Sequence, residues 1–191
     1  MKLNKHKIRQ MVGISILSAI VVVLQLLGSF IKLGPMVSVS LVQIPIVVGA
    51  ALYGPSAGAC LGGVFGLVVL FQPDTAFFYG INFFGTVITV MVKGIAEGYL
   101  SGLTYRALEK KNQWLAVGLA AAVAPLVNTG LFALGSRLFF WEAFAEMGNG
   151  DAMMILLTVM IGFNFIAEFI VNVVCAPVIV RILHAARKNI G

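Results

Sequence analysis

The sequence predicts an all-α integral membrane protein, folded as a compact bundle of six transmembrane helices. Composition is the first reason: the 191 residues are 60% hydrophobic and 10% charged, with a mean hydropathy of +1.03, whereas soluble domains carry about 25% charged residues. Length is the second, because the apolar segments approach the roughly 20 residues that a spanning helix needs. The third is that most charged residues lie at segment ends.

The six helices are predicted in order from the apolar segments and the breaks between them. The first, 11–31, follows the basic stretch "MKLNKHKIRQ". It is longer than the apolar part of a signal peptide and no small-residue cleavage site closes it, so we expect it to be retained. Gly-Pro pairs and polar stretches separate the others, at 37–53, 56–72, 80–107, 114–138 and 152–184. Because most connections are short, residues 1–191 are expected to form a single domain.

The distribution of lysine and arginine predicts that both termini are cytoplasmic. With six spans, the outer loops hold only Lys32 and Arg137. The inner ends hold Lys2, Lys5, Lys7, Arg9, Arg106, Lys110, Lys111, Arg181, Arg187 and Lys188. One alternative stays open, because segments 37–53 and 56–72 are short for spans. A re-entrant hairpin there would leave four spans with the same charge asymmetry.

Glycines recur at four-residue spacing in two regions of the chain. They are Gly54, Gly58, Gly62 and Gly66, followed by Gly94, Gly98 and Gly102. Such ridges let helix backbones approach closely in lipid. We therefore expect tight packing of these helices inside the bundle, with a sliding contact to a partner protein as the alternative.

Three segments place polar side chains at similar depths. In segment 80–107, a stripe at spacings of three and four residues lies on one helical face: Asn82, Thr86, Thr89, Lys93 and Glu97. Segment 152–184 carries Asn164, Glu168 and Asn172 in the same way, and segment 114–138 contributes Asn128 and Thr129. Because ionisable groups inside a bilayer are costly, such residues mark candidate functional sites.

We interpret these residues as a polar pocket for a small hydrophilic molecule. The expected substrate contacts are Asn82, Thr86, Lys93, Asn128, Arg137, Trp141, Asn164 and Glu168, with Glu97 and Asn172 as structural support. The loop "SRLFFWEAFAEMGNGD" would form either an aromatic belt at the membrane interface or a lid over the ligand, with Arg137 reaching an anionic group. The alternative is that Lys93, Glu97 and Glu168 neutralise one another and only lock the helices together.

Several kinds of chemistry find no support in the sequence. The GxxxxGK[ST] phosphate loop is absent. His6, His184, Cys60 and Cys175 form no metal or disulfide set, and no nucleophile triad is apparent. We therefore expect no enzyme activity, no metal and no cofactor. Membrane topology explains the basic ends, so no nucleic-acid partner is expected.

Residues 41–71, "LVQIPIVVGAALYGPSAGACLGGVFGLVVLF", resemble the second and third helices of S components, the substrate-capturing subunits of energy-coupling factor (ECF) vitamin transporters. The Lys93-Gly94 pair, "APLVNTGLFALG" at 124–135, the six-helix plan and the chain length resemble the same family. The resemblance implies a subunit of the prokaryotic cell membrane that binds a vitamin or related micronutrient near the outer side. It also implies a transmembrane coupling subunit and two cytoplasmic ATPase subunits as partners in the lipid bilayer.

The family docks its coupling subunit through an Ala-x-x-x-Ala motif in the first helix. The matching positions here are Ser15 and Ala19, and serine is small enough to keep the close approach. Pantothenate fits the polar inventory best, because it carries one carboxylate, an amide and two hydroxyls; pyridoxine-type compounds, folate, lipoate and cobalamin stay open. Two other classes are also open: an autonomous ion- or proton-coupled carrier that uses Glu97 and Glu168, and a membrane scaffold without a ligand.

Overall fold

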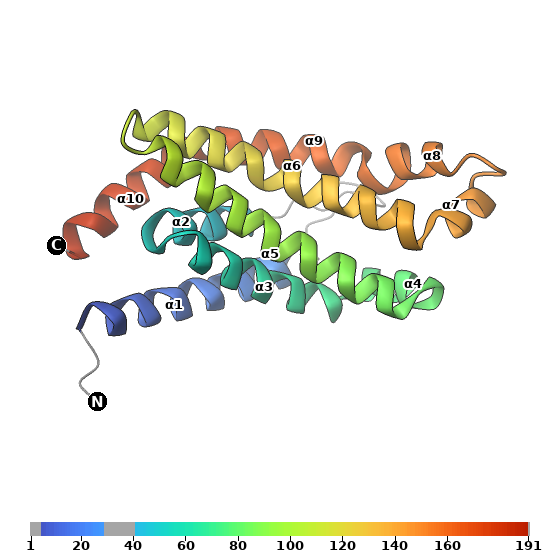
Figure 1. Cartoon of the computed structure of the whole chain (residues 1–191), viewed down its shortest axis with the longest axis horizontal. Coiled ribbons are helices and arrows are strands. Elements are labelled where there is room, and N and C mark those ends of the chain that lie inside the picture. The colour runs from blue at the N-terminus through green and yellow to red at the C-terminus, as the bar shows by residue number, and fades with distance from the viewer. Residues whose placement is uncertain (1–4, 29–40, 191) are drawn as a thin grey trace.

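The computed structural model describes residues 5–28 and 41–190, without the side chains of residues 5, 6, 159, 160, 163, 164, 189 and 190. Within these ranges every regular element is a helix, and the long helices run side by side in an elongated bundle (Figure 1). The elements are α1 (Lys5–Gly28), α2 (Gln43–Tyr53), α3 (Pro55–Leu70), α4 (Pro73–Ile81), α5 (Phe83–Leu108), α6 (Gln113–Phe139), α7 (Trp141–Met147), α8 (Ala152–Met154), the π-helical segment η1 (Ile155–Ile161), α9 (Gly162–Val174) and α10 (Ala176–Ile190). The predicted all-α class is confirmed.

Three of these helices, α1, α5 and α6, are long and apolar enough to cross a membrane. Two bent pairs, α3 with α4 and α9 with α10, raise the number to five if each pair counts as one span. Helix α2 is apolar but has only 11 residues, which is about 16 Å of helix. By length and composition, the described residues therefore contain three to five candidate spans.

The prediction of one continuous helix over 152–184 is wrong. The chain forms α8, η1, α9 and α10 there, and the last two meet at a bend of 47° beside Cys175. Pro177 explains the bend, because it has no N–H to donate to the carbonyl of Val173 and its ring crowds the preceding turn. Helix α4 is not predicted from the sequence. It starts with Pro73, a favoured first residue of a helix, and its axis turns 80° from that of α3.

The short helix α2 lies inside the bundle. Eight of its residues are buried, and it contacts α1, α3, α5, α6 and α10. Val47 and Val48 belong to a core cluster with Ala120 of α6 and Ile179 of α10. The other helices therefore cover α2 on most of its surface.

Helices α3 and α5 approach each other at backbone distance. A Cβ atom at Gly58 would lie 2.9 Å from the carbonyl carbon of Gly98, and one at Gly62 would lie 2.7 Å from that of Gly94. Cβ atoms essentially never come closer than 3.0 Å to another residue's heavy atoms, so these positions require glycine unless the helices separate. The predicted packing of the glycine ridges inside the bundle is confirmed.

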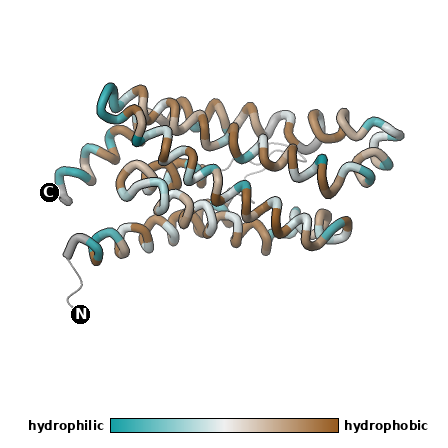
Figure 2. The backbone as a smooth tube through the Cα atoms, in the orientation of Figure 1, coloured by the Kyte–Doolittle hydropathy of each residue, from teal (hydrophilic) through white to brown (hydrophobic). Residues whose placement is uncertain are grey.

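The two ends of the bundle differ in chemistry. Helix α1 begins and α10 ends at the same end, on the left in Figure 1. Arg9, Arg106 and Arg187 line one cavity there, and we call this the basic end. At the opposite end, called the aromatic end, the rings of Phe140 and Phe144 pack together. Figure 2 shows hydrophilic residues concentrated at both ends and mostly hydrophobic residues along the helices between them.

Candidate functional site

A buried hydrogen bond joins α5 to α6 in the middle of the bundle. The side-chain amide of Asn128 donates to Oε2 of Glu97. Glu97 has no exposed surface, and Asn128 is 8% exposed. The second carboxyl oxygen, Oε1, has no hydrogen-bond partner among the described residues. The bundle therefore holds a carboxyl group inside it with one oxygen still able to accept a hydrogen bond.

A second polar group links α2 to α9. The Asn172 amide donates to Oε1 of Gln43 at 2.5 Å and to the backbone carbonyl of Glu168 at 2.8 Å. Gln43 Nε2 in turn donates to Oε2 of Glu168 at 3.5 Å, which is at the long limit for a hydrogen bond. Gln43 and Asn172 are both buried, so Gln43 is the amide that contacts the Glu168 carboxyl group, and Asn172 holds Gln43 in turn.

Lys93 lies near the carboxyl groups of both. It interacts electrostatically with both Glu97 and Glu168, and its Nζ lies 5.2 Å from the ring centroid of Phe132, within cation–π range. Within residues 5–28 and 41–190 it makes no hydrogen bond and no ion pair of 4.0 Å or less. The ammonium group therefore has two carboxyl groups near it and direct contact with neither. We call Gln43, Lys93, Glu97, Asn128, Glu168 and Asn172 the polar cluster.

Two residues of this region, Gln43 in the polar cluster and Phe132 beside Lys93, are not predicted from the sequence. Gln43 is the one amide in an apolar helix, and its polar character within "LVQIPIVVGA" was the available signal. Gln43 is not followed by other polar residues at helical spacing, so the spacing of polar residues does not mark it as part of a site. Phe132 gave no signal of its own, because an aromatic residue in an apolar helix most often packs in a core.

The upper part of the predicted α5 stripe has local partners. The Asn82 side chain caps α5 by accepting a hydrogen bond from the backbone N–H of Gly85 at 2.8 Å. The Thr86 hydroxyl donates to the Asn82 carbonyl at 2.7 Å. Asn82 lies about 16 Å along the helix from Lys93, so the structure does not bring Asn82 and Thr86 into the polar cluster. The side chain of Asn164 lies outside the described residues.

Arg137 and Trp141 lie together at the aromatic end. The Arg137 guanidinium carbon is 4.4 Å from the ring centroid of Trp141, a cation–π contact. Phe140 and Phe144 are 2% and 0% exposed and pack beside Phe78 of α4. These two rings therefore belong to the core of the aromatic end, whereas Arg137 is exposed and Trp141 is half-buried.

Ser15 and Ala19 are both exposed on α1. The Ser15 hydroxyl donates to the carbonyl of Met11 at 2.9 Å, so it is satisfied within its own helix. Large apolar side chains flank the two small residues on the same uncovered helix, among them Val12, Ile16, Ile20 and Val23. This chain leaves that face of α1 open to lipid or to a partner.

The predicted pocket and the cavity do not coincide. Within the polar cluster, Glu97, Gln43 and Asn172 are each 2% exposed or less, whereas Lys93 and Glu168 are half-buried. A cavity of about 450 Å³ lies at the basic end, lined by other residues. No group of three or more metal-ligating side chains occurs in the described part of the chain.

The described residues form several apolar helices of spanning length, and charged residues lie inside the bundle between them. These features define a multi-pass membrane protein with an intramembrane polar site. The sequence model of the family described as "ECF transporter, substrate-specific component" matches residues 9–180. The chain belongs to this family. It is therefore a transporter component and not a member of an enzyme family.

Two curated relatives are similar over most of their length. The pantothenic acid transporter PanT of Lactococcus lactis subsp. cremoris is 27% identical over 200 residues, covering 98% of this chain and 100% of the relative. The pantothenate transporter PanT of Leuconostoc mesenteroides subsp. mesenteroides is 26% identical over 160 residues, covering 80% of this chain and 78% of the relative. No solved structure matches the chain significantly.

Proposed function

We propose that this chain captures pantothenate outside the cell and delivers it inward as the substrate-binding subunit of an ECF transporter. The family match supports a vitamin-binding subunit, and the names of the two relatives support pantothenate as the vitamin. In this proposal the chain works with a transmembrane coupling subunit and two cytoplasmic ATPases. It spans the membrane six times, with the basic end in the cytoplasm, in keeping with the lysine and arginine distribution.

One observation carries the choice of ligand. Lys93 is a cation inside the bundle whose ammonium group has no direct partner among the described residues. Glu97 and Glu168 each accept a hydrogen bond from an amide instead. An ammonium group in that position is suited to the carboxylate of pantothenate, because charge-assisted hydrogen bonds are strong where water is scarce.

The remaining polar groups suit the rest of the ligand. Oε1 of Glu97 and Oδ1 of Asn172 are buried acceptors without a partner among the described residues. Pantothenate offers two hydroxyls and one amide N–H as donors for such acceptors. We assign Lys93, Asn128 and Glu168 to the inner part of the site. Outside the polar cluster, toward the aromatic end, the proposed contacts are Asn82, Thr86, Arg137, Trp141 and Asn164. Glu97 and Asn172 support the site and also offer their unpartnered oxygens to the ligand.

The proposal is tested by identifying what the protein binds. The protein is purified alone, denatured, and the released small molecules are identified by mass spectrometry. Pantothenate in near-equal amount to the protein supports the proposal. If none is released and calorimetry shows no saturable binding of added pantothenate, the ligand assignment is wrong.

The dependence on partners is tested separately. Purified protein is placed in vesicles with and without a coupling subunit and ATPases from an ECF transporter, and uptake of labelled pantothenate is measured. We expect uptake only with the complete complex and ATP. Uptake by this chain alone would instead support an autonomous carrier in which Glu97 and Glu168 exchange protons.

A further inference from the structure

The basic end contains a cavity that the proposed function does not use. It has a volume of about 450 Å³, within the range of small-molecule sites. Four parts of the chain that are distant in sequence meet around it: the start of α1, the turn between α2 and α3, the end of α5 and the end of α10. Each of three helices contributes an arginine, namely Arg9, Arg106 and Arg187.

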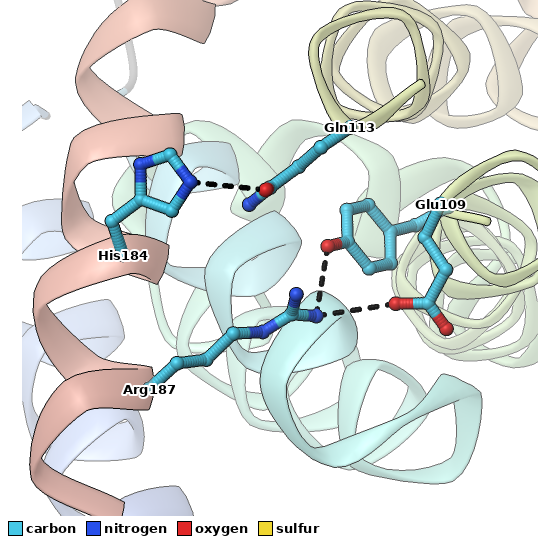
Figure 3. Close-up of polar contacts among 5 residues, drawn as sticks. Glu109, Gln113, His184 and Arg187 are labelled. Atoms are coloured by element: carbon cyan, nitrogen blue, oxygen red, sulfur yellow. Dashed lines mark hydrogen bonds and ion pairs between the residues drawn. The ribbon is translucent and has the colours of Figure 1, made fainter. Parts of the chain in front are cut away.

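Arg187 is held in place by two partners at the end of α5, Tyr105 within the helix and Glu109 directly after it. Its Nη2 donates to Oε2 of Glu109 at 3.1 Å and to the hydroxyl of Tyr105 at 2.9 Å. Figure 3 shows the arginine reaching from α10 toward Glu109. Tyr105 is 2% exposed, so the contact is anchored in the core. A guanidinium group has five N–H donors, and these two bonds leave Nε and Nη1 for a ligand.

Arg106 lies against a backbone turn that only glycine fits. Gly54 joins α2 to α3 with φ of +95° and ψ of 174°, a conformation essentially confined to glycine. A Cβ atom at Gly54 would lie 4.0 Å from the guanidinium carbon of Arg106. Gly54 itself lines the cavity, so the turn presents backbone and no side chain there.

The charge in the cavity is predominantly positive. Glu109 is the only acidic residue among its lining residues, against three arginines. The last turn of α2 supplies an apolar wall, including Ala50, Ala51 and Leu52. A concave, positively charged site with an apolar wall concentrates the local electrostatic field, and arginines bind phosphate oxygens in a bidentate manner.

An exposed tryptophan at the basic end supports a position of this end at the membrane surface. Trp114, at the start of α6 on the same side of the bundle, is 57% exposed, and exposed tryptophans favour the membrane–water interface. Topology alone requires only that positive charges lie somewhere at this end, and the loop residues Lys110 and Lys111 already meet that need. It does not require three arginines to converge on one cavity.

We propose that this cavity is a phosphate-binding site, which takes the phosphodiester of an anionic phospholipid or the phosphate of a soluble ester. Arg106 and the unused donors of Arg187 bind the phosphate oxygens, and Arg9 closes the site from α1. Basic pockets between transmembrane helices recognise anionic lipid headgroups by the same chemistry. This inference does not depend on which vitamin the chain carries.

The test uses native mass spectrometry of the purified full chain after removal of co-purified lipid. The probes are phosphatidylglycerol and phosphatidylcholine with identical acyl chains, and inorganic phosphate as the soluble probe. Arg106→Gln removes one cavity charge. Lys111→Gln is the matched control, because Lys111 is exposed at the same end, does not line the cavity and loses the same charge. Arg9→Gln is a second cavity variant, and melting temperatures verify that all three variants fold.

We expect phosphatidylglycerol to bind and phosphatidylcholine to bind far more weakly. Arg106→Gln should weaken phosphatidylglycerol binding by about tenfold, the loss of one charge-assisted contact, with a similar loss in Arg9→Gln and no change in Lys111→Gln. If millimolar inorganic phosphate displaces the lipid and itself stabilises the wild type but not Arg106→Gln, the site also accepts soluble phosphate. The site is wrong if neither phosphatidylglycerol nor inorganic phosphate binds more weakly to the cavity variants than to Lys111→Gln.

Discussion

Asn128 of α6 and Glu97 of α5 form a hydrogen bond in the interior of the bundle, from amide to carboxyl group. The bond satisfies one oxygen of a group that has no exposed surface. It also ties together the two longest helices, which are the most complete candidate spans. The Glu97–Asn128 hydrogen bond therefore stabilises the packing of α5 against α6, and both residues also belong to the polar cluster.

Removing one member of this pair should destabilise the protein more than removing both. Asn128→Leu leaves a buried carboxyl group without its donor, and we expect a loss of about 1–3 kcal/mol in the free energy of unfolding. Asn128→Leu combined with Glu97→Leu should recover most of that loss, since an apolar pair of similar size carries no unsatisfied group. Thermal unfolding in detergent measures both variants. An Asn128→Leu protein that melts at the wild-type temperature would contradict the role of the bond.

Lys93 should determine the affinity for pantothenate. Lys93→Ala removes the proposed carboxylate partner, and we expect binding to weaken by at least tenfold, the lower end for a charge-assisted hydrogen bond. Lys93→Arg keeps the charge and should weaken binding less. Lys111→Ala, an exposed lysine at the basic end, is the control and should bind as the wild type does. Titration calorimetry decides, and unchanged affinity in Lys93→Ala would restrict Lys93 to holding the helices together.

The glycine contact between α3 and α5 should tolerate no side chain. Gly62→Ala places a methyl group against the backbone of Gly94, and overpacking of this kind costs about 1–3 kcal/mol. Gly130→Ala in α6 is the matched control, because a Cβ there meets nothing within 4 Å. The control should be neutral or slightly stabilising through helix propensity. Melting temperatures that fall equally in both variants would refute the packing argument.

The exposed face of α1 should contact the coupling subunit. Ser15→Trp and Ala19→Trp place a bulky ring where close approach of helices needs small residues. We expect both variants to lose co-purification of the coupling subunit while retaining ligand binding. Leu119→Trp, at a 43% exposed position of α6, controls for a large side chain facing lipid. Undiminished co-purification with both α1 variants would show that another face docks the partner.

Local signals explain why α5 and α6 could be predicted closely from the sequence. Asn82 caps α5, and Asn112 caps α6 by accepting from the backbone N–H groups of Trp114 and Leu115 at 2.9 and 3.2 Å. Each asparagine lies in or beside a polar break, so sequence and structure agree within a few residues. Lys93, Glu97 and Asn128 could be placed near one another for a similar reason, since helical spacing fixes their depth and face.

Tertiary contacts explain what the sequence could not supply. Gln43 joins the polar cluster only because α2 lies inside the bundle beside α9. The arginines of the basic end indicate membrane topology, but nothing in their spacing indicates that Arg9, Arg106 and Arg187 share a cavity. The bend at Pro177 was missed because proline is tolerated in the interior of α6 at Pro125, so the residue alone does not decide whether a membrane helix breaks.

The enclosure of α2 has a consequence for how the protein is made. Val47 and Val48 are synthesised early, yet they pack against Ile179 and Val180 near the end of the chain. A helix of 11 residues is too short to cross a bilayer independently, so during synthesis α2 depends on neighbours that emerge later. A nascent chain interrupted before Ala176 would leave α2 without its last covering helix. Closure of this core therefore requires that α10 has already been synthesised.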